Sequence, residues 1–302
     1  MRASAASPET GSTARGIAYM ALAMLLLTIG DALTKWVGSH LPVGQVIFFR
    51  ALFIFIPTFA IVASSGGLAT LKVHDKQGIG VRALFYISAT ALISTSMILL
   101  PLADAVALLF AGPLFVTALA TPMLGEHVGW RRWTAVCVGF AGVMIMLRPT
   151  PDTIQLIAIV PIVAALFSAL RDVTTRRISA TESSNAIMFW SNSVLLCVSA
   201  GSAAFGWVSM TFADLWQLAL MGTIVGVAHW IMIEAYRLGE AAAVSPFKYT
   251  GIVWGALLGY LFWGTVPDAF ILAGGALVVA SGLYILHRET RRKQITTPAH
   301  NV

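Results

Sequence analysis

Two stretches of the chain carry charged residues inside apolar sequence, where they could bind or move a charged group. Asp31, Lys35 and Arg50 lie in the first stretch, 30–50. Similar sequence recurs 141 residues later, where Asp172 corresponds to Asp31 and Arg176 to Lys35. A charge near the centre of a bilayer costs roughly a few kcal/mol, so such a side chain usually faces a cavity or a partner. These residues are therefore candidates for a transport site.

The acidic and basic residues of each stretch have a spacing that allows a local ion pair. Asp31 and Lys35 are four residues apart, as are Asp172 and Arg176, which places each pair on one helix face. In one interpretation the two cations reach lipid headgroups and each aspartate stabilises a helix end. In the other, the four residues are gating or proton-coupling groups, with the aspartates lining the two mouths of a central cavity.

Arg50 differs from the other charged residues because its counterpart, Ser191, is uncharged. It lies about eight residues into an apolar run, roughly 12 Å at 1.5 Å per residue, which is too deep for its guanidinium to reach the surface easily. We expect it to face protein or water. It would either pair with Asp31 on the neighbouring helix or bind a substrate anion or take part in gating.

Lys248 lies at a similar depth in the sequence S-P-F-K-Y-T-G-I-V-W-G, 245–255. Pro246 removes a backbone hydrogen bond just before it, and the glycines at 251, 255 and 259 form a ridge that another helix can approach closely. An interrupted helix with a buried cation and Tyr249 beside it indicates a binding site, and packing of a kinked helix is the alternative. The first half has its own interruption at Gly112-Pro113.

His229 and Glu234 could titrate during transport, although a lone histidine or glutamate near a helix end is more often only hydrogen-bonded. The sequence has no H-E-x-x-H, G-x-S-x-G or Walker motif, so we do not expect an enzyme. Cys137 and Cys197 stand in separate apolar segments without metal-ligand spacing, and we interpret both as small core residues. We expect no cofactor and no metal.

The composition indicates that membrane helices position these residues. Of the 302 residues, 58% are hydrophobic and 11% are charged, against about 25% charged in soluble domains. Apolar runs of roughly 20 residues predict an all-α polytopic membrane protein with ten transmembrane helices. Their expected ranges are 16–37, 42–63, 78–99, 103–123, 130–147, 153–176, 184–206, 213–238, 241–264 and 268–287. Residues 1–15 are predicted to be a disordered cytoplasmic tail and 288–302 a second cytoplasmic tail.

The distribution of basic residues predicts the orientation. With both termini in the cytoplasm, 15 of the 19 lysines and arginines fall at cytoplasmic ends, as the positive-inside rule expects. This distribution explains the net charge of +6 without nucleic-acid binding. The fifteen are Arg2, Arg15, Lys72, Lys76, Arg82, Arg131, Arg132, Arg171, Arg176, Arg177, Arg237, Arg288, Arg291, Arg292 and Lys293.

The two similar stretches are separated by five predicted spans, so they would cross the membrane in opposite senses. A second match at an offset of 139 places Gly112 on Gly251. We therefore expect two inverted five-helix repeats, 16–148 and 153–287, which is a transporter architecture with its site near the midplane between the halves.

With these motifs the sequence resembles the drug/metabolite transporter superfamily, specifically carriers with two EamA domains. The resemblance rests on G-D-A-L-T-K-W with P-V-G-Q-V-I-F-F-R, on G-P-L-F-V-T-A-L-A-T-P-M-L-G-E, and on the stretch around Lys248. The first of these is most similar to S-adenosylmethionine uptake carriers, with riboflavin carriers and amino-acid exporters as more distant relatives. The resemblance implies ten helices around a central cavity and alternating access.

We therefore expect an inner-membrane carrier for a small polar or zwitterionic metabolite. Arg50 and Lys248 can bind a substrate carboxylate, and aromatic side chains can contact a ring or a sulfonium. An exporter of amino acids or toxic compounds is the main alternative, and a channel or non-transporting receptor is a less favoured one. The expected partners are a small-molecule substrate and the lipid bilayer, with a homodimer left open. The aromatic candidates are Trp36, Phe110, Tyr249 and Trp254.

Overall fold

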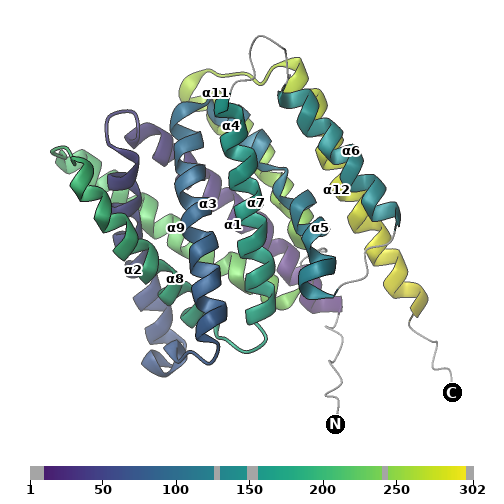
Figure 1. Cartoon of the computed structure of the whole chain (residues 1–302), viewed down its shortest axis with the longest axis horizontal. Helices are drawn as coiled ribbons and strands as arrows, with labels where there is room; N and C mark the ends of the chain where they lie inside the picture. Colours follow the sequence, from purple (N-terminus) through teal and green to yellow (C-terminus); the bar gives the residue numbers. More distant parts are fainter. Residues whose placement is uncertain (1–9, 126–129, 148–155, 240–243, 297–302) are drawn as a thin grey trace.

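The computed structural model describes residues 10–125, 130–147, 156–239 and 244–296, and within these ranges every regular element is a helix. The helices form one bundle (Figure 1). In chain order they are α1 Thr10–Val37, α2 Val43–Ser64, η1 Gly67–Leu71, α3 Lys76–Leu99, α4 Leu102–Leu109, α5 Gly112–Leu124, α6 Trp130–Leu147, α7 Leu156–Ile178, α8 Ser184–Ala200, η2 Gly201–Phe205, α9 Phe212–Leu238, η3 Ser245–Tyr249, α11 Thr250–Trp263 and α12 Ala269–Thr296.

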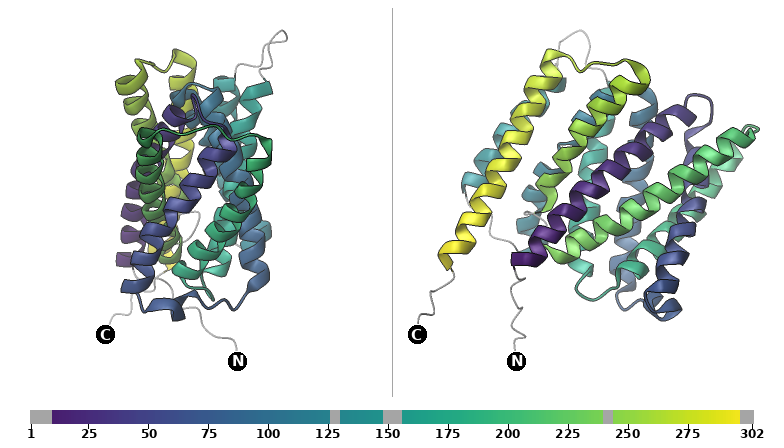
Figure 2. Two further views of the ribbon diagram at one scale, coloured as in Figure 1. Left: turned by 90° about the vertical axis from the view of Figure 1, so that its left-hand side faces the viewer. Right: turned by 180° about the vertical axis from the view of Figure 1, so that it is seen from behind.

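The expected all-α membrane fold is confirmed at this level. Five of the described helices are long and apolar enough to cross a bilayer, and three shorter apolar segments accompany them. The chain is thus a multi-pass membrane protein. The count of ten spans and their division into two inverted halves stay predictions. α1 begins and α12 ends at the same end of the bundle (Figure 2), while the side of the membrane that this end faces stays a prediction.

Two of the predicted spans are interrupted, and the expected positions of both interruptions are confirmed. The segment 103–123 is divided into α4 and α5 around Phe110 and Ala111, directly before Pro113. The segment 241–264 contains η3, which holds a proline in its first turn, followed by α11. Proline cannot donate the backbone hydrogen bond that a continuous helix needs, so regular helix ends at both places.

The ends of the chain differ from the predicted tails. α1 begins at Thr10, inside the segment predicted to be disordered, and α12 continues past residue 287 to Thr296. The remaining tail residues, 1–9 and 297–302, lie outside the described residues, as do the start of the predicted spans at 153 and 241.

Four helices form the walls that position the site. α1 packs along α9, and α3 packs along α7. α2 lies against α9 and α8. α6 and α12 form a separate pair at the side of the bundle (Figure 1). Because α1, α3, α7 and α9 all face the middle, their polar residues gather there.

The α6 and α12 pair depends on contact between two backbones. A Cβ atom at Gly142 would lie 2.6 Å from the carbonyl oxygen of Gly274, closer than real Cβ contacts come. Small residues at helix crossings allow this approach in membranes, where packing rather than water exclusion holds helices together. Gly275, beside this contact in sequence, faces open space.

We predict that Gly142→Ala lowers the stability of the folded protein by about 1–3 kcal/mol, because the added methyl group forces the two backbones apart. Gly275→Ala is the matched control and should leave stability within about 0.5 kcal/mol. The melting temperature of the purified protein in detergent checks both. Equal melting temperatures for the two variants would contradict the close crossing.

Candidate functional site

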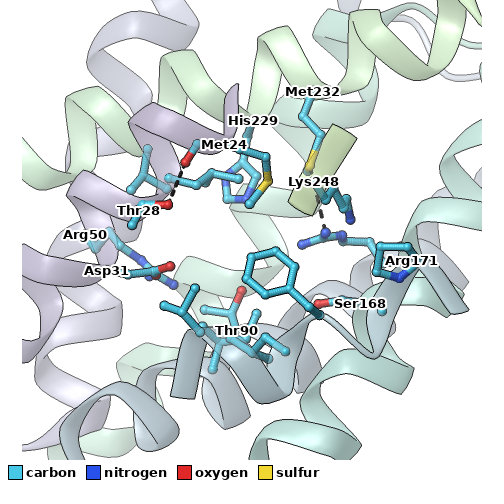
Figure 3. Close-up of a pocket in the computed structure, with 18 residues that line it drawn as sticks. Met24, Thr28, Asp31, Arg50, Thr90, Ser168, Arg171, His229, Met232 and Lys248 are labelled. Carbon is cyan, nitrogen blue, oxygen red and sulfur yellow. Dashed lines mark hydrogen bonds between the residues drawn. The ribbon is translucent and has the colours of Figure 1, made fainter. Parts of the chain in front are cut away.

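A cavity with a volume of about 110 Å³ lies in the middle of the bundle. By this measure a single water needs roughly 10–15 Å³, so the cavity has room for several waters or a small ligand group. Four charged side chains line it, Asp31 from α1, Arg50 from α2, Arg171 from α7 and Lys248 from η3 (Figure 3). The apolar lining separates the two pairs of charges, so the cavity has two polar walls.

The two helix interruptions open onto this cavity. Phe110 and Pro113 line it at the first interruption, and Lys248 lines it at the second. Irregular backbone at membrane depth is tolerated where it faces protein or a water-filled cavity. The predicted glycine ridge of α11 brings the neighbouring helices close, since a Cβ at Gly251 would lie 2.9 Å from Met24 Cε. The ridge thus fits α11 against α1 beside the cavity.

Asp172 holds one wall together through bonds from three residues. Arg171 Nε and Nη2 donate to its Oδ1 at 2.9 and 2.8 Å, and the Tyr236 hydroxyl donates to its Oδ2 at 3.1 Å. Lys248 Nζ donates to the same Oδ2. Asp172 is 1% exposed, and burial of its charge depends on these bonds. The carboxylate therefore pairs with both cations of this wall, offsets one of their two positive charges, and ties α7 to α9 and η3.

Asp31 and Arg50 form the opposite wall and are much less satisfied. Their side chains lie next to each other in Figure 3, yet among the described residues neither makes a side-chain hydrogen bond or an ion pair within 4 Å. Arg50 is 5% exposed, and its Nε is buried without a hydrogen-bond partner in the described part of the chain. The alternative that Arg50 forms an ion pair with Asp31 is thus not what the structure shows.

The local ion pairs that the spacing allows do not form. Lys35 Nζ donates instead to the carbonyl oxygens of Leu100 at 2.7 Å and Met97 at 3.3 Å. Arg176 Nη1 donates to the carbonyl oxygens of Tyr236 at 3.1 Å and Arg237 at 3.4 Å. The last carbonyls of a helix lack partners within the helix and carry partial negative charge. They attract the two cations away from the aspartates on their own helices.

His229 lines the cavity on α9, whereas Glu234 does not. The Nδ1 atom of His229 lies 3.4 Å from the hydroxyl oxygen of Tyr86, and the two rings meet edge to face. Glu234 lies 3.6 Å from Nε of Arg237, one turn further along α9. Only His229 is placed to act on a bound ligand, and its proton-coupling role stays a prediction.

Of the four aromatic candidates, Phe110 alone lines the cavity. Tyr249 packs behind it with ring centroids 5.8 Å apart, and its hydroxyl is buried without a partner in the described residues. Trp36 is 48% exposed and packs against Trp263 at 6.3 Å. Trp254 is half-buried on α11 and is not part of the lining. Their role in substrate binding stays a prediction, which the geometry favours for Phe110.

Two of the arginines that the charge count puts at cytoplasmic ends are buried in the structure. Arg171 lines the cavity, and Arg82 lies in a neighbouring recess, where it donates to Thr175 Oγ1 at 2.8 Å and Ser191 Oγ at 2.6 Å. Arg82 lies six residues after Lys76, the first residue of α3. It is therefore roughly 9 Å into the helix at 1.5 Å per residue. The depth argument applied to Arg50 therefore also indicates burial of Arg82.

Comparison with known proteins shows that this chain is similar to transporters. Residues 14–148 match the EamA-like transporter family. A riboflavin transporter of Rhizobium johnstonii is 29% identical over 282 residues, 92% of this chain and 93% of the relative. An S-adenosylmethionine uptake transporter of Rickettsia bellii is 26% identical, with 91% and 94% covered, and the pseudopaline exporter CntI of Pseudomonas aeruginosa is 27% identical, with 88% and 94% covered.

A crystal structure with 18% sequence identity matches the fold with a TM-score of 0.69, over 93% of this chain and 99% of that one. At this identity it supports the fold alone. The resemblance to EamA carriers of the drug/metabolite transporter superfamily is confirmed by the family match and the named relatives. Transport of a small metabolite is supported by those relatives, and they differ in what they carry and in direction.

We predict that Asp172→Asn destabilises the folded protein strongly, by about 3–5 kcal/mol, because it leaves two buried cations without a carboxylate. Asp31→Asn is the matched control and should cost much less, since Asp31 makes no ion pair within the described ranges. Adding Lys248→Met to Asp172→Asn should recover part of the loss. Melting temperatures of the purified variants measure this, and equal losses for the two asparagine variants would refute the assignment.

Proposed function

We propose that the protein is a secondary transporter that moves a small zwitterionic metabolite across the inner membrane by alternating access, with both termini in the cytoplasm. The observation that carries the proposal is the buried guanidinium of Arg50 at the wall of the central cavity, whose Nε has no hydrogen-bond partner among the described residues. The relatives support transport of a small metabolite. The charge arrangement supports the finer choice of substrate.

Arg50 is better suited than Lys248 to bind a substrate anion. Lys248 already donates to Asp172, which also accepts from Arg171. Burying a charged group without hydrogen-bond partners is costly, so a cavity that holds Arg50 in this condition favours a ligand that supplies acceptors. A carboxylate fits a guanidinium through two parallel bonds. We therefore assign the anionic group of the substrate to Arg50.

Asp31 completes a site for opposite charges. It lies beside Arg50 on the adjacent helix and makes no ion pair among the described residues (Figure 3). An ammonium or a sulfonium next to the substrate carboxylate could therefore meet Asp31, while the apolar part meets Phe110 and Met24. S-adenosylmethionine, which one relative takes up, carries all of these groups and is the first compound to test.

Alternating access is the mechanism that fits a site enclosed between packed helices. The cavity lies between the α1 and α9 pair and the α3 and α7 pair. In inverted-repeat carriers, rocking of one helix bundle against another exposes such a site to one side at a time. The same fold can export, as the pseudopaline exporter does, so export of amino acids or toxic compounds is the main alternative.

We predict that Arg50→Ala lowers the apparent affinity for the transported zwitterion about 10- to 100-fold, the effect of losing a charged hydrogen bond worth roughly 1.5–3 kcal/mol. Arg50→Lys should recover only part of it, because lysine cannot form the two parallel bonds. Counterflow in proteoliposomes, screened with S-adenosylmethionine, riboflavin and amino acids, is the measurement. Trp133→Phe, at an exposed position on α6 away from the cavity, is the control.

The same screen separates the alternatives. Unchanged counterflow in folded Arg50→Ala would overturn the site assignment. A channel or a non-transporting receptor predicts that none of the compounds undergoes counterflow. Uptake into whole cells compared with uptake into inside-out vesicles then distinguishes import from export.

A further inference from the structure

Two cations bridge the helix pairs that enclose the cavity, one at each end of the bundle. α1 and α3 both end at the upper end in Figure 1, whereas α7 and α9 both end at the lower end. The pairs α1 with α9 and α3 with α7 pack along their lengths, and contact between α1 and α3 or between α7 and α9 is sparse. The α1 and α9 pair can therefore separate from the α3 and α7 pair where α1 meets α3 and where α7 meets α9.

Lys35 crosses the sparse contact at the upper end. From α1 it donates to the carbonyl oxygens of Leu100 and Met97, at the end of α3, at 2.7 and 3.3 Å. Its ammonium also lies 5.9 Å from the ring of Trp263. Lys35 belongs to the α1 and α9 pair. It is therefore bonded to the end of a helix, α3, that belongs to the other pair.

Arg176 crosses the sparse contact at the lower end. From α7 it donates to the carbonyl oxygens of Tyr236 and Arg237, at the end of α9, at 3.1 and 3.4 Å. The neighbouring Arg177 is exposed and forms no bond of this kind within the described residues. The bridge is specific to one of two adjacent arginines.

The two bridges are equivalent in the sequence. Lys35 and Arg176 are 141 residues apart, and the acceptors Met97 and Tyr236 are 139 residues apart. Each donor lies at the end of the first helix of its predicted half, and each acceptor at the end of the third full-length helix. The same contact thus occurs twice, pointing in opposite directions.

We propose that Lys35 and Arg176 are reciprocal gate clamps, each of which closes one end of the central cavity, and that transport releases them one at a time. The proposal rests on the proposed alternating access. Rocking of the α1 and α9 pair against the α3 and α7 pair must separate helix ends at one end of the bundle while it keeps them together at the other. A cation bonded to helix-end carbonyls stabilises the closed end, and its release requires no change within either helix pair.

The test places a reporter cysteine on the cavity wall and asks from which side it can be reached. Ser168→Cys, on the α7 wall, is introduced after Cys137 and Cys197 are replaced by alanine. A membrane-impermeant maleimide is added to right-side-out and to inside-out vesicles, with no substrate present. The rate of labelling from each face reports how often that end is open.

Lys35→Met should raise labelling from the face where Lys35 lies by about tenfold, which corresponds to about 1.4 kcal/mol in the gating equilibrium, and lower it from the other face. Arg176→Met should do the reverse. Lys35→Arg and Arg176→Lys keep a donor and should restore the original pattern. Arg177→Met is the matched control and should change neither rate.

A purely structural role predicts lower melting temperatures with unchanged sidedness, and that result would overturn the proposal. So would a shift toward the same face in both variants. Where a methionine variant does not fold, Lys35→Ala or Arg176→Ala, which also lacks a donor, replaces it and must give the same direction of shift. Because labelling needs no substrate, failed counterflow in the unmodified protein with the labelling pattern intact would reject the proposed function and leave the clamps standing.

Discussion

The bilayer offers no water to a buried charge, and Asp172 shows how the protein meets this constraint. Its carboxylate accepts bonds from Arg171, Tyr236 and Lys248, and so it joins α7, α9 and η3 at the level of the cavity. η3 contains irregular backbone and a cation, neither of which is stable against lipid. Because Asp172 holds Lys248 in place, the second helix interruption can lie beside the cavity, and α11 can continue from it against α1.

The two walls of the cavity have opposite electrostatic character as a result. The Asp172 wall holds two cations and one carboxylate, so it is bonded internally and keeps a net positive charge. The wall of Asp31 and Arg50 carries one charge of each sign without bonds among the described residues, and it is the part of the cavity that a ligand can complete. Under the proposed function, these two residues select for charges at the correct separation on the ligand and disfavour a lone cation or a lone anion, which would leave one of the two residues unmatched.

The sequence predicted the features that depend on depth within a single helix, namely burial and helix interruption. It did not predict the hydrogen-bond partners that come from distant helices. The depth of Arg50 and Lys248 predicted burial, and proline predicted both interruptions. The partners of Lys35 and Arg176 could not be found this way, because local spacing points to the aspartates while the carbonyls they bind belong to helices 60 or more residues away. The burial of Arg82 and Arg171 was not predicted, because a count of basic residues carries no information about which face of a helix they occupy.

The acceptors of Lys35 and Arg176 are main-chain oxygens, and every amino acid supplies one. Substitution at positions 97, 100, 236 or 237 therefore leaves the acceptor in place so long as the helix end keeps its shape. Only the donor side of each contact depends on a particular residue type, so the two ends of the molecule can diverge independently in sequence without losing this geometry. Comparison of sequences for correlated substitutions easily overlooks such a contact. The acceptor is a main-chain oxygen, so the residue that carries it does not have to change when the donor residue changes.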